Sequence, residues 1–270
     1  MKILLLGANG QVGFELKRAL TPLADLVAAT RSGEDGTRIA DLGDAASLRA
    51  ALDAADADVV VNAAAYTAVD RAEDEPAVAE RINGEAPREI GAWAKSRGAL
   101  VVHYSTDYVF DGNGTRPYRE DDATAPLGVY GRSKLDGENA LRASGCDHVI
   151  LRTAWVYASR GKNFLLTMLK VGAERERLRV VDDQRGTPTP ARLIADVTSK
   201  ILAAGSVQPG TYHLCASGEC TWYDFAQAIF ARAHEAGLVA RALRKMWIFS
   251  CARAEITVAR SRPSKKSIRN

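Results

Sequence analysis

Short apolar runs alternate with amphipathic stretches through the first 150 residues of the chain. Five of the apolar runs predict buried strands, at Lys2–Leu6, Leu26–Thr30, Asp58–Asn62, Ala99–Ser105 and His148–Arg152. Between them, apolar residues recur at helical spacing and predict helices over Gly10–Leu20, Ala45–Ala54, Pro76–Arg97 and Pro126–Ala143. Strands that alternate with helices indicate an α/β fold with a doubly wound parallel sheet. Such a sheet binds its ligands at the carboxyl ends of the strands.

The pattern loosens after residue 155. Helical spacing recurs over Asn163–Ala173, Ala191–Ala203 and Trp222–Ala236, and extended segments are predicted at Arg179–Val181 and Thr211–Leu214. We therefore expect residues 1–155 to form the main domain. Residues 156–238 should form a smaller C-terminal lobe that is interleaved with the core.

The charge of the chain is unevenly distributed. The net charge is +3, but residues 239–270 carry nine Lys/Arg and one Glu, so the rest of the chain is acidic. An acidic body argues against nucleic-acid binding, and no run of eighteen apolar residues exists that could span a membrane. The four cysteines show no metal-binding or disulfide spacing, which is typical of reduced thiols in a cytoplasmic protein.

A glycine-rich motif, Gly7-x-x-Gly10-x-x-Gly13, follows the first predicted strand and opens the first helix. Glycines at this spacing allow a tight turn and let backbone N–H groups approach a pyrophosphate at a helix N-terminus. The motif therefore predicts a Rossmann-like domain that binds a dinucleotide.

The end of the second predicted strand bears on the choice of dinucleotide. NAD enzymes place an acidic residue there to bind the ribose 2′-hydroxyl, whereas this strand ends in Thr30-Arg31-Ser32. The guanidinium of Arg31 can bind the 2′-phosphate of NADP. NADPH is the expected cofactor, and NADH is the alternative.

Two further segments are placed to line the cofactor. Asp41 and Leu42 could flank the adenine. Small residues after the third predicted strand, followed by a tyrosine, would let the cofactor lie against the backbone; they are Ala63, Ala64, Ala65 and Tyr66.

The candidate catalytic residues are Thr106, Tyr130 and Lys134. Tyr130 and Lys134 are four residues apart and share one face of a predicted helix. A nearby ammonium favours the phenolate and should lower the pKa of the tyrosine, and the same lysine can hold the nicotinamide ribose. Thr106 ends the fourth predicted strand, where its hydroxyl can hydrogen-bond a substrate carbonyl. The set predicts reduction of a carbonyl group.

Six segments resemble the dTDP-4-dehydrorhamnose reductases, a family of the extended short-chain dehydrogenase/reductase superfamily. In family order they are Gly7–Gly13, Asn62–Asp70, Ser105–Gly112, Tyr130–Glu138, Leu151–Tyr157 and Asp183–Thr189. The resemblance implies that NADPH reduces dTDP-4-dehydro-β-L-rhamnose to dTDP-β-L-rhamnose, the last step of dTDP-L-rhamnose synthesis. It also implies that residues 1–155 bind the cofactor and carry the catalytic residues, and that the smaller lobe binds the substrate.

The resemblance also implies residue roles. Gly10, Gln11 and Val12 would bind the pyrophosphate, Asp41 and Leu42 the adenosine end, and Ala63–Ala65 the middle of the cofactor. Thr106 and Tyr130 would hold the keto oxygen, and Lys134 the ribose. The sugar-nucleotide pocket would be shaped by Val69, Asp70, Asp107 and Trp155.

The chain departs from the family in two places. Some members bind magnesium between subunits through acidic residues, and Glu15 matches one such position, but the other is Arg192. We therefore expect no metal, and both a monomer and a homodimer stay open. The basic, Arg- and Ser-rich composition of residues 239–270 indicates a frame change or a truncated product, with a divergent tail as the alternative.

Two other functions are compatible with parts of this pattern. One is another extended sugar-nucleotide epimerase or dehydratase, which Arg31 argues against because those enzymes usually carry an acidic residue there. The other is a non-catalytic NADP-binding regulatory subunit, against which the complete Thr106, Tyr130 and Lys134 set argues.

Overall fold

The computed structural model describes residues 1–175, 177–205, 208–237 and 245–249. The chain divides into two compact units. The larger unit comprises Met1–Gly161 and Thr189–Ala216, and the smaller comprises Lys162–Pro188 and Ser217–Asn270. The predicted range 1–155 lies wholly in the larger unit, and the predicted range 156–238 divides between the two.

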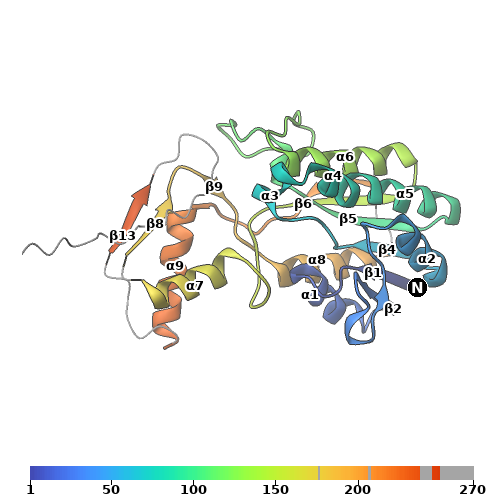
Figure 1. Cartoon of the computed structure of the whole chain (residues 1–270), viewed down its shortest axis with the longest axis horizontal. Coiled ribbons are helices and arrows are strands. Elements are labelled where there is room, and N and C mark those ends of the chain that lie inside the picture. Colours follow the sequence, from blue (N-terminus) through green and yellow to red (C-terminus); the bar gives the residue numbers. More distant parts are fainter. Residues whose placement is uncertain (176, 206–207, 238–244, 250–270) are drawn as a thin grey trace, which may run out of the picture. The chain divides into compact units, whose positions relative to one another are not determined.

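A seven-stranded parallel sheet forms the centre of the larger unit (Figure 1). The strand order is β11-β6-β5-β4-β1-β2-β3. The strands are β1 (Lys2–Leu6), β2 (Asp25–Thr30), β3 (Arg38–Ile39), β4 (Val59–Asn62), β5 (Leu100–Thr106), β6 (His148–Thr153) and β11 (Gly210–His213). The chain order reverses between β1 and β4, so the crevice that a doubly wound sheet offers to a ligand opens at the carboxyl ends of these two strands.

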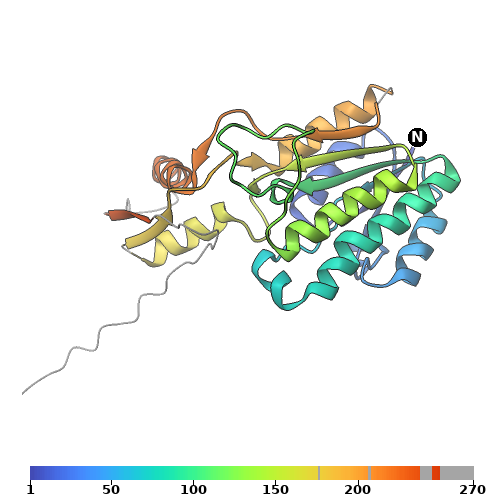
Figure 2. The ribbon, with the colours of Figure 1, turned by 90° about the horizontal axis from the view of Figure 1, so that it is seen from above.

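Helices cover both faces of this sheet. Leu5 of β1 packs with α1 (Gln11–Leu20) and α8 (Ala191–Ala203) on one face. Leu4 packs on the other face with three helices that Figure 2 shows side by side: α2 (Ala45–Ala55), α5 (Ala86–Arg97) and α6 (Val129–Ser144). Burial on both faces explains why the strands are almost wholly apolar. The predicted Rossmann-like, doubly wound sheet is confirmed.

The helix predicted over Pro76–Arg97 is interrupted. A π-helical turn, η2 (Arg81–Glu85), separates α4 (Pro76–Glu80) from α5. Its Asn83 side chain accepts a hydrogen bond from the Tyr66 N–H (2.9 Å) and donates to the Tyr66 carbonyl (3.0 Å) and to Ser133 Oγ (3.1 Å). Widened turns of this kind are frequent at functional sites, and this one ties the segment after β4 to α6.

Helix α6 begins at Val129, three residues later than predicted. The Val129 N–H donates to the carboxylate of Glu73 (2.7 Å), which lies in α3 (Val69–Asp74). An acidic group at a helix N-terminus satisfies a backbone N–H that would otherwise lack a partner. The start of α6 is therefore set by a residue distant in the sequence.

A buried ion pair joins α6 to β6. Both oxygens of Glu138 accept hydrogen bonds from the Arg152 guanidinium, at 2.9 and 2.8 Å. The two side chains are 0% and 4% exposed. Arg152 also donates to the Glu120 carbonyl (3.2 Å), so the pair connects the helix, the strand and the loop before α6.

The segment predicted as extended at Thr211–Leu214 belongs to the main sheet. It forms β11, which pairs in parallel with β6 at the sheet edge. Two-residue strands β7 (Val156–Tyr157) and β10 (Thr189–Pro190) also pair within the larger unit. The remaining short elements there are η1 (Glu34–Gly36) and η3 (Asp107–Val109).

The smaller unit packs α7 (Phe164–Glu174) and α9 (Trp222–Glu235) around a small apolar core that includes Met168, Ile229 and Phe230. Its strands are β8 (Arg177–Val181), β9 (Arg185–Gly186), β12 (Cys220–Thr221) and β13 (Lys245–Phe249), with β13 parallel to β8 and β12 antiparallel to β9. Strand β13 falls within the basic stretch 239–270. The other residues of that stretch lie outside those that the structure describes.

Candidate active site

The glycine-rich turn after β1 requires glycine at two positions. Gly7 has a φ of 77°, and a Cβ there would lie 2.7 Å from the Ala64 nitrogen. A Cβ on Gly13 would lie 1.9 Å from the Gly7 carbonyl oxygen. Any side chain would therefore push the turn away from β4 or push α1 away from the turn. The sequence motif thus packs directly against the Ala63–Ala65 segment at the point where the strand order reverses.

The N-terminus of α1 is open to an anion. Gly10 precedes the helix with no side-chain hydrogen bond to the first turn, and that turn, which contains Gln11 and Val12, has no acidic residue. A helix N-terminus of this kind presents backbone N–H groups and a partial positive charge. The glycine contacts and the uncapped turn therefore suit a dinucleotide pyrophosphate.

The predicted adenosine residues have different local roles. Arg31 is exposed at the end of β2. The carboxylate of Asp41 accepts from the Gly43 N–H (2.8 Å) and so closes the turn before α2. The Leu42 side chain is part of the apolar core. Contact of these residues with a nucleotide stays a prediction.

A hollow of about 370 Å³ opens beside the glycine-rich turn, between that turn and the end of β2. It is lined in part by Ala8, Asn9 and Thr30, and by three basic residues that the sequence analysis did not single out: Lys17, Arg18 and Arg160. The Arg160 guanidinium lies 3.7 Å from the centre of the Phe14 ring on α1. Nothing in the local pattern around Arg160 indicates this position, because it depends on how the chain returns after β7.

Tyr130 and Thr106 meet at the carboxyl end of β5. Their side chains are hydrogen-bonded, and the Tyr130 ring packs edge-on against Tyr108 with centroids 5.5 Å apart. Thr106 Oγ1 also donates to Asp107 Oδ1 (3.0 Å). Burial raises the pKa of the Asp107 carboxyl to about 6, although its hydrogen bond with Thr106 works to lower it. The Thr106 hydroxyl therefore lies between the Tyr130 phenol and the Asp107 carboxyl, and it interacts with both.

The pKa of Tyr130 is shifted opposite to our expectation. Burial raises it, the Thr106 hydrogen bond opposes this, and Asp107 adds to the increase. The predicted lowering by Lys134 does not occur in this structure, because the Lys134 amine is engaged elsewhere. The phenol is thus protonated at neutral pH, which is the form that donates a proton.

Lys134 lies in a buried polar row that the sequence analysis missed. Its Nζ donates to the Tyr104 carbonyl (2.7 Å) and lies 3.2 Å from Nε2 of His103. Nδ1 of His103 lies 3.2 Å from the amide nitrogen of Asn62, its register partner on β4. A polar side chain in each of two Val-rich strands, Asn62 and His103, was visible in the sequence. Their contact could not be predicted, because it depends on the register between β4 and β5.

The other predicted pocket residues lie at the same edge of the sheet. Val69 and Asp70 begin α3, and Asp107 begins η3. Trp155, between β6 and β7, has a φ of 48°, a left-handed conformation that non-glycine residues rarely adopt and that is common at functional sites. Tyr66 donates its hydroxyl proton to Glu75 (2.6 Å), and its backbone is bonded to Asn83. Their contacts with a substrate stay predictions.

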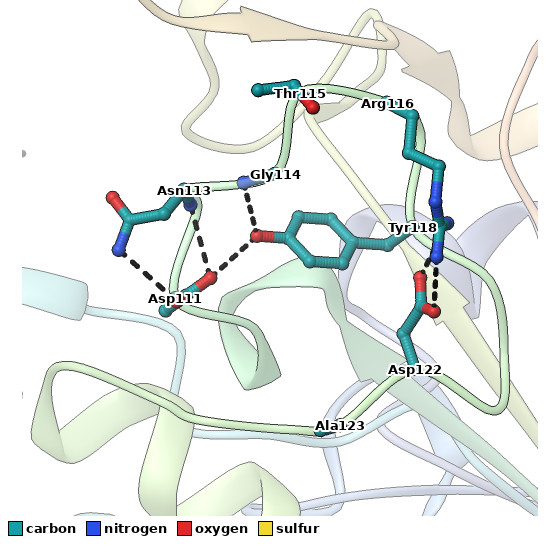
Figure 3. A pocket seen from close by; sticks show the side chains of 8 residues that line it. All are labelled: Asp111, Asn113, Gly114, Thr115, Arg116, Tyr118, Asp122 and Ala123. Carbon is teal, nitrogen blue, oxygen red and sulfur yellow. Dashed lines mark hydrogen bonds and ion pairs between the residues drawn. The ribbon is translucent and has the colours of Figure 1, made fainter.

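A second hollow, of about 430 Å³, lies within the loop between η3 and α6 (Figure 3). Its polar side chains bond to one another: Tyr118 donates to Asp111 (2.6 Å), and Arg116 forms two hydrogen bonds with Asp122. None of the candidate catalytic residues lines it. The candidate active site is therefore the edge formed by β1, β4, β5 and α6.

The described residues form neither a metal-binding cluster nor a helix that could span a membrane. Among the residues that the structure describes, no group of three or more His, Cys, Asp or Glu side chains is placed to hold a metal ion. Glu15 instead pairs with Arg18 (3.1 Å), and Arg192 lies 4.0 Å from Asp196. No helix within the described part of the chain is long and apolar enough to cross a bilayer.

A doubly wound sheet with a glycine-rich first turn, and a tyrosine and a lysine one turn apart on α6, defines an extended short-chain dehydrogenase/reductase. The whole chain, residues 1–270, matches the family described as RmlD substrate binding domain. The chain belongs to the dTDP-4-dehydrorhamnose reductase family.

Individual relatives agree with this assignment. The chain is 48% identical over 241 residues to the dTDP-4-dehydrorhamnose reductase of Escherichia coli (strain K12), covering 88% of this chain and 80% of that protein. It is 50% identical over 238 residues to that of Burkholderia thailandensis, covering 86% and 78%. The crystal structure of the Bacillus anthracis enzyme in complex with NADP has a TM-score of 0.83 at 32% identity, covering 93% and 85%. The predicted family is confirmed.

Proposed function

We propose that this chain reduces dTDP-4-dehydro-β-L-rhamnose to dTDP-β-L-rhamnose, with NADPH as the hydride donor. The observation that carries the proposal is the meeting of Tyr130 and Thr106 at the carboxyl end of β5, in the same parallel sheet whose β1 leads into the glycine-rich turn. The reductases to which the chain is similar carry this activity in their names, and one was solved with NADP.

The chain's own residues supply positioning and protons. The N–H groups of the first turn of α1 bind the pyrophosphate. The small side chains of Ala63–Ala65, which follow β4 next to this turn, let the cofactor approach the backbone. Bound NADPH supplies the hydride that reduces the C4 carbonyl of the sugar. Thr106 orients the carbonyl oxygen, and the protonated phenol of Tyr130 gives its proton to the oxygen that becomes a hydroxyl. Lys134 provides a buried positive charge one helical turn from Tyr130.

Substrate recognition is assigned to residues on several elements of the same edge. Val69, Asp70, Asp107 and Trp155 would shape the sugar-nucleotide pocket, and the strained backbone of Trp155 supports a functional role for that residue. We also assign substrate binding to the smaller unit. The cytoplasmic location and the choice between monomer and homodimer stay predictions.

Arg31→Ala is expected to raise the KM for NADPH about tenfold and to leave the KM for NADH unchanged. A hydrogen bond from a guanidinium to a phosphate contributes about 1.5 kcal/mol, which corresponds to about a factor of ten. Steady-state kinetics with both cofactors measure the two constants. Arg49→Ala, which removes another exposed arginine, is the control and should change neither constant. An equal effect of Arg31→Ala on NADH and NADPH would contradict the assignment to the 2′-phosphate.

The activity itself is tested with purified chain and enzymatically generated dTDP-4-dehydrorhamnose. We expect NADPH absorbance to fall only when the sugar is present, with formation of dTDP-rhamnose. Binding of NADPH without any substrate-dependent oxidation would overturn the proposal and favour a regulatory subunit. Tightly retained NAD with interconversion of sugar epimers would instead favour an epimerase.

A further inference from the structure

Asn62, His103 and Lys134 form a buried row of hydrogen bonds. The orientation of the Asn62 amide determines which atom donates and which accepts in each of them. The three side chains are 1%, 1% and 2% exposed, so they must satisfy one another rather than rely on solvent. The row begins at the backbone N–H of Ala64, which donates to Asn62 Oδ1 (3.2 Å). A backbone N–H can only donate, so the orientation of the Asn62 amide is fixed.

The fixed amide determines which nitrogen of His103 carries the proton. Since Oδ1 of Asn62 faces Ala64, its NH₂ group faces Nδ1 of His103 and donates to it. Nδ1 must therefore be an acceptor without a proton. A neutral imidazole then carries its proton on Nε2. Burial lowers the pKa of His103 well below its ordinary value, and the charge of Lys134 adds to this, so the ring is neutral.

The Nε2 proton points at Lys134. The amine nitrogen lies 3.2 Å from Nε2, and only an uncharged amine has a lone pair to accept this hydrogen bond. The same amine can still donate to the Tyr104 carbonyl (2.7 Å). With Lys134 as an ammonium, two N–H groups must oppose each other somewhere between Ala64 and Lys134. The row therefore stabilises the neutral amine relative to the ammonium.

Other charged groups around Lys134 act on the same equilibrium. From α6 itself, Glu138 is one turn beyond, and its charge raises the pKa of Lys134. From β6, Arg152 pairs with Glu138 and offsets that charge. From β5, His103 and the Tyr104 carbonyl face the amine, and Asp107 of η3 faces Tyr130 instead. Burial is the largest influence and lowers the pKa of Lys134 to about 8.

We propose that His103, held in its Nε2–H form by Asn62 and Ala64, is a positioning residue that favours release of the Lys134 proton, which restores the phenol of Tyr130 after each hydride transfer. This inference rests on the proposed reductase function. It assigns to the β4–β5 pair a task beyond cofactor binding, because the same Ala64 that packs against Gly7 begins the row that ends at the amine.

The proton steps balance without a further reactant. The Tyr130 proton passes to the sugar oxygen and leaves a phenolate. The Lys134 ammonium then releases a proton that reaches the phenolate through solvent, and the amine that remains accepts the hydrogen bond from His103 Nε2. Solvent returns one proton to Lys134 before the next turnover. The ammonium is required in each cycle, so turnover should fall as the pH rises through the pKa of Lys134.

The state of the His103 ring can be measured without substrate. The full chain, labelled with ¹⁵N-histidine, is examined by NMR at pH 9.5, where Lys134 is mainly uncharged, and the signals of the four histidines are assigned by replacing each in turn. We expect the Nε2–H form for His103. In Asn62→Asp, a carboxylate accepts from both Ala64 and the ring, so the Nδ1–H form is expected. An Nδ1–H ring in the unchanged chain, or an unchanged Nε2–H ring in Asn62→Asp, would overturn the proposal.

The kinetic consequence is tested with His103→Gln. Glutamine can turn its amide oxygen towards Lys134 and so favour the ammonium. We expect the alkaline limb of the kcat profile to move up by about one pH unit, since losing one opposed buried donor corresponds to about that shift. A purely structural role would lower activity or thermal stability without moving the limb, and that result would overturn the proposal.

A matched histidine serves as the control. His148→Gln changes a partly buried histidine at the start of β6, where its ring bonds to the Cys146 carbonyl, and should leave the pH profile unchanged. The NMR measurement needs no catalysis, so failure of the reductase assay and failure of the His103 assignment are separate outcomes.

Discussion

Tyr130→Phe is expected to lower kcat by about a hundredfold or more while leaving NADPH affinity close to that of the unchanged chain. The substitution removes only the hydroxyl, and the ring can keep its edge-on contact with Tyr108. What is lost is the proton that a protonated phenol donates to the reduced oxygen, and general acid catalysis typically contributes about 10²–10⁴-fold. Steady-state kinetics with the keto-sugar give kcat, and fluorescence titration gives the affinity for NADPH.

The matched control is Tyr212→Phe. Tyr212 lies on the edge strand β11, where its hydroxyl donates to the Gln208 carbonyl, and it takes no part in the site. Its removal should leave kcat unchanged. Turnover by Tyr130→Phe within a few-fold of the unchanged chain would mean that another group supplies the proton. Asp107, whose pKa is raised to about 6, would be the first to examine.

Glu138→Ala is expected to lower the free energy of unfolding by about 3–5 kcal/mol, because it leaves the Arg152 charge buried without its partner. Arg152 would keep the Glu120 carbonyl and the face of Phe110, 5.1 Å from its guanidinium, neither of which carries a full negative charge. Urea denaturation at pH 7 measures the loss.

The same pair has a predictable pH dependence. Burial works to raise the pKa of Glu138, but the hydrogen bonds and charge of Arg152 outweigh it, so the folded-state pKa lies below the ordinary value. A lowered folded-state pKa means that the stabilisation is complete above the unfolded-state pKa of about 4.3 and is lost as the pH falls through the folded-state value. The difference between Glu138→Ala and the unchanged chain should therefore shrink in acid.

Two controls separate burial from charge. Glu219→Ala breaks an exposed pair with Arg185 and should cost no more than about 1 kcal/mol. The double change Glu138→Leu with Arg152→Met removes both charges together and should recover most of the lost stability. A loss in Glu138→Ala as small as that in Glu219→Ala would contradict the interpretation that this change leaves the Arg152 charge buried and uncompensated.

Much of the larger unit could be predicted because its elements are determined locally. The buried run Lys2–Leu6 is strand β1, and the helical spacing of Ala191–Ala203 is helix α8, with the same bounds. Both depend only on periodicity within one segment. Strand β11 shows the limit of this reasoning. Its extended conformation was predicted, but its partner is β6, some sixty positions earlier, and no local pattern indicates that pairing.

The candidate site divides in the same way. The glycine-rich turn and the Tyr130–Lys134 pair are short motifs, and the structure brings them to one edge of the sheet. Asn83 and His103 were missed because each acts through a contact set by register or by an irregular turn. The direction of the Tyr130 pKa was wrong for a related reason. Proximity in sequence indicated a charge beside the phenol, whereas the fold directs that charge to β5.

The widened turn at Arg81–Glu85 has a consequence for how this architecture can change. Helix α4, the turn η2 and helix α5 form one continuous helical segment, from Pro76 to Arg97. One residue more or fewer in the middle of this segment would rotate α4 relative to α5 by about 100°. Asn83 would then no longer reach both Tyr66 and Ser133. This helical segment can be lengthened or shortened only at its two ends, so natural insertions should occur in the loops that flank it. An engineer who moves this site onto another scaffold must carry the irregular turn with it.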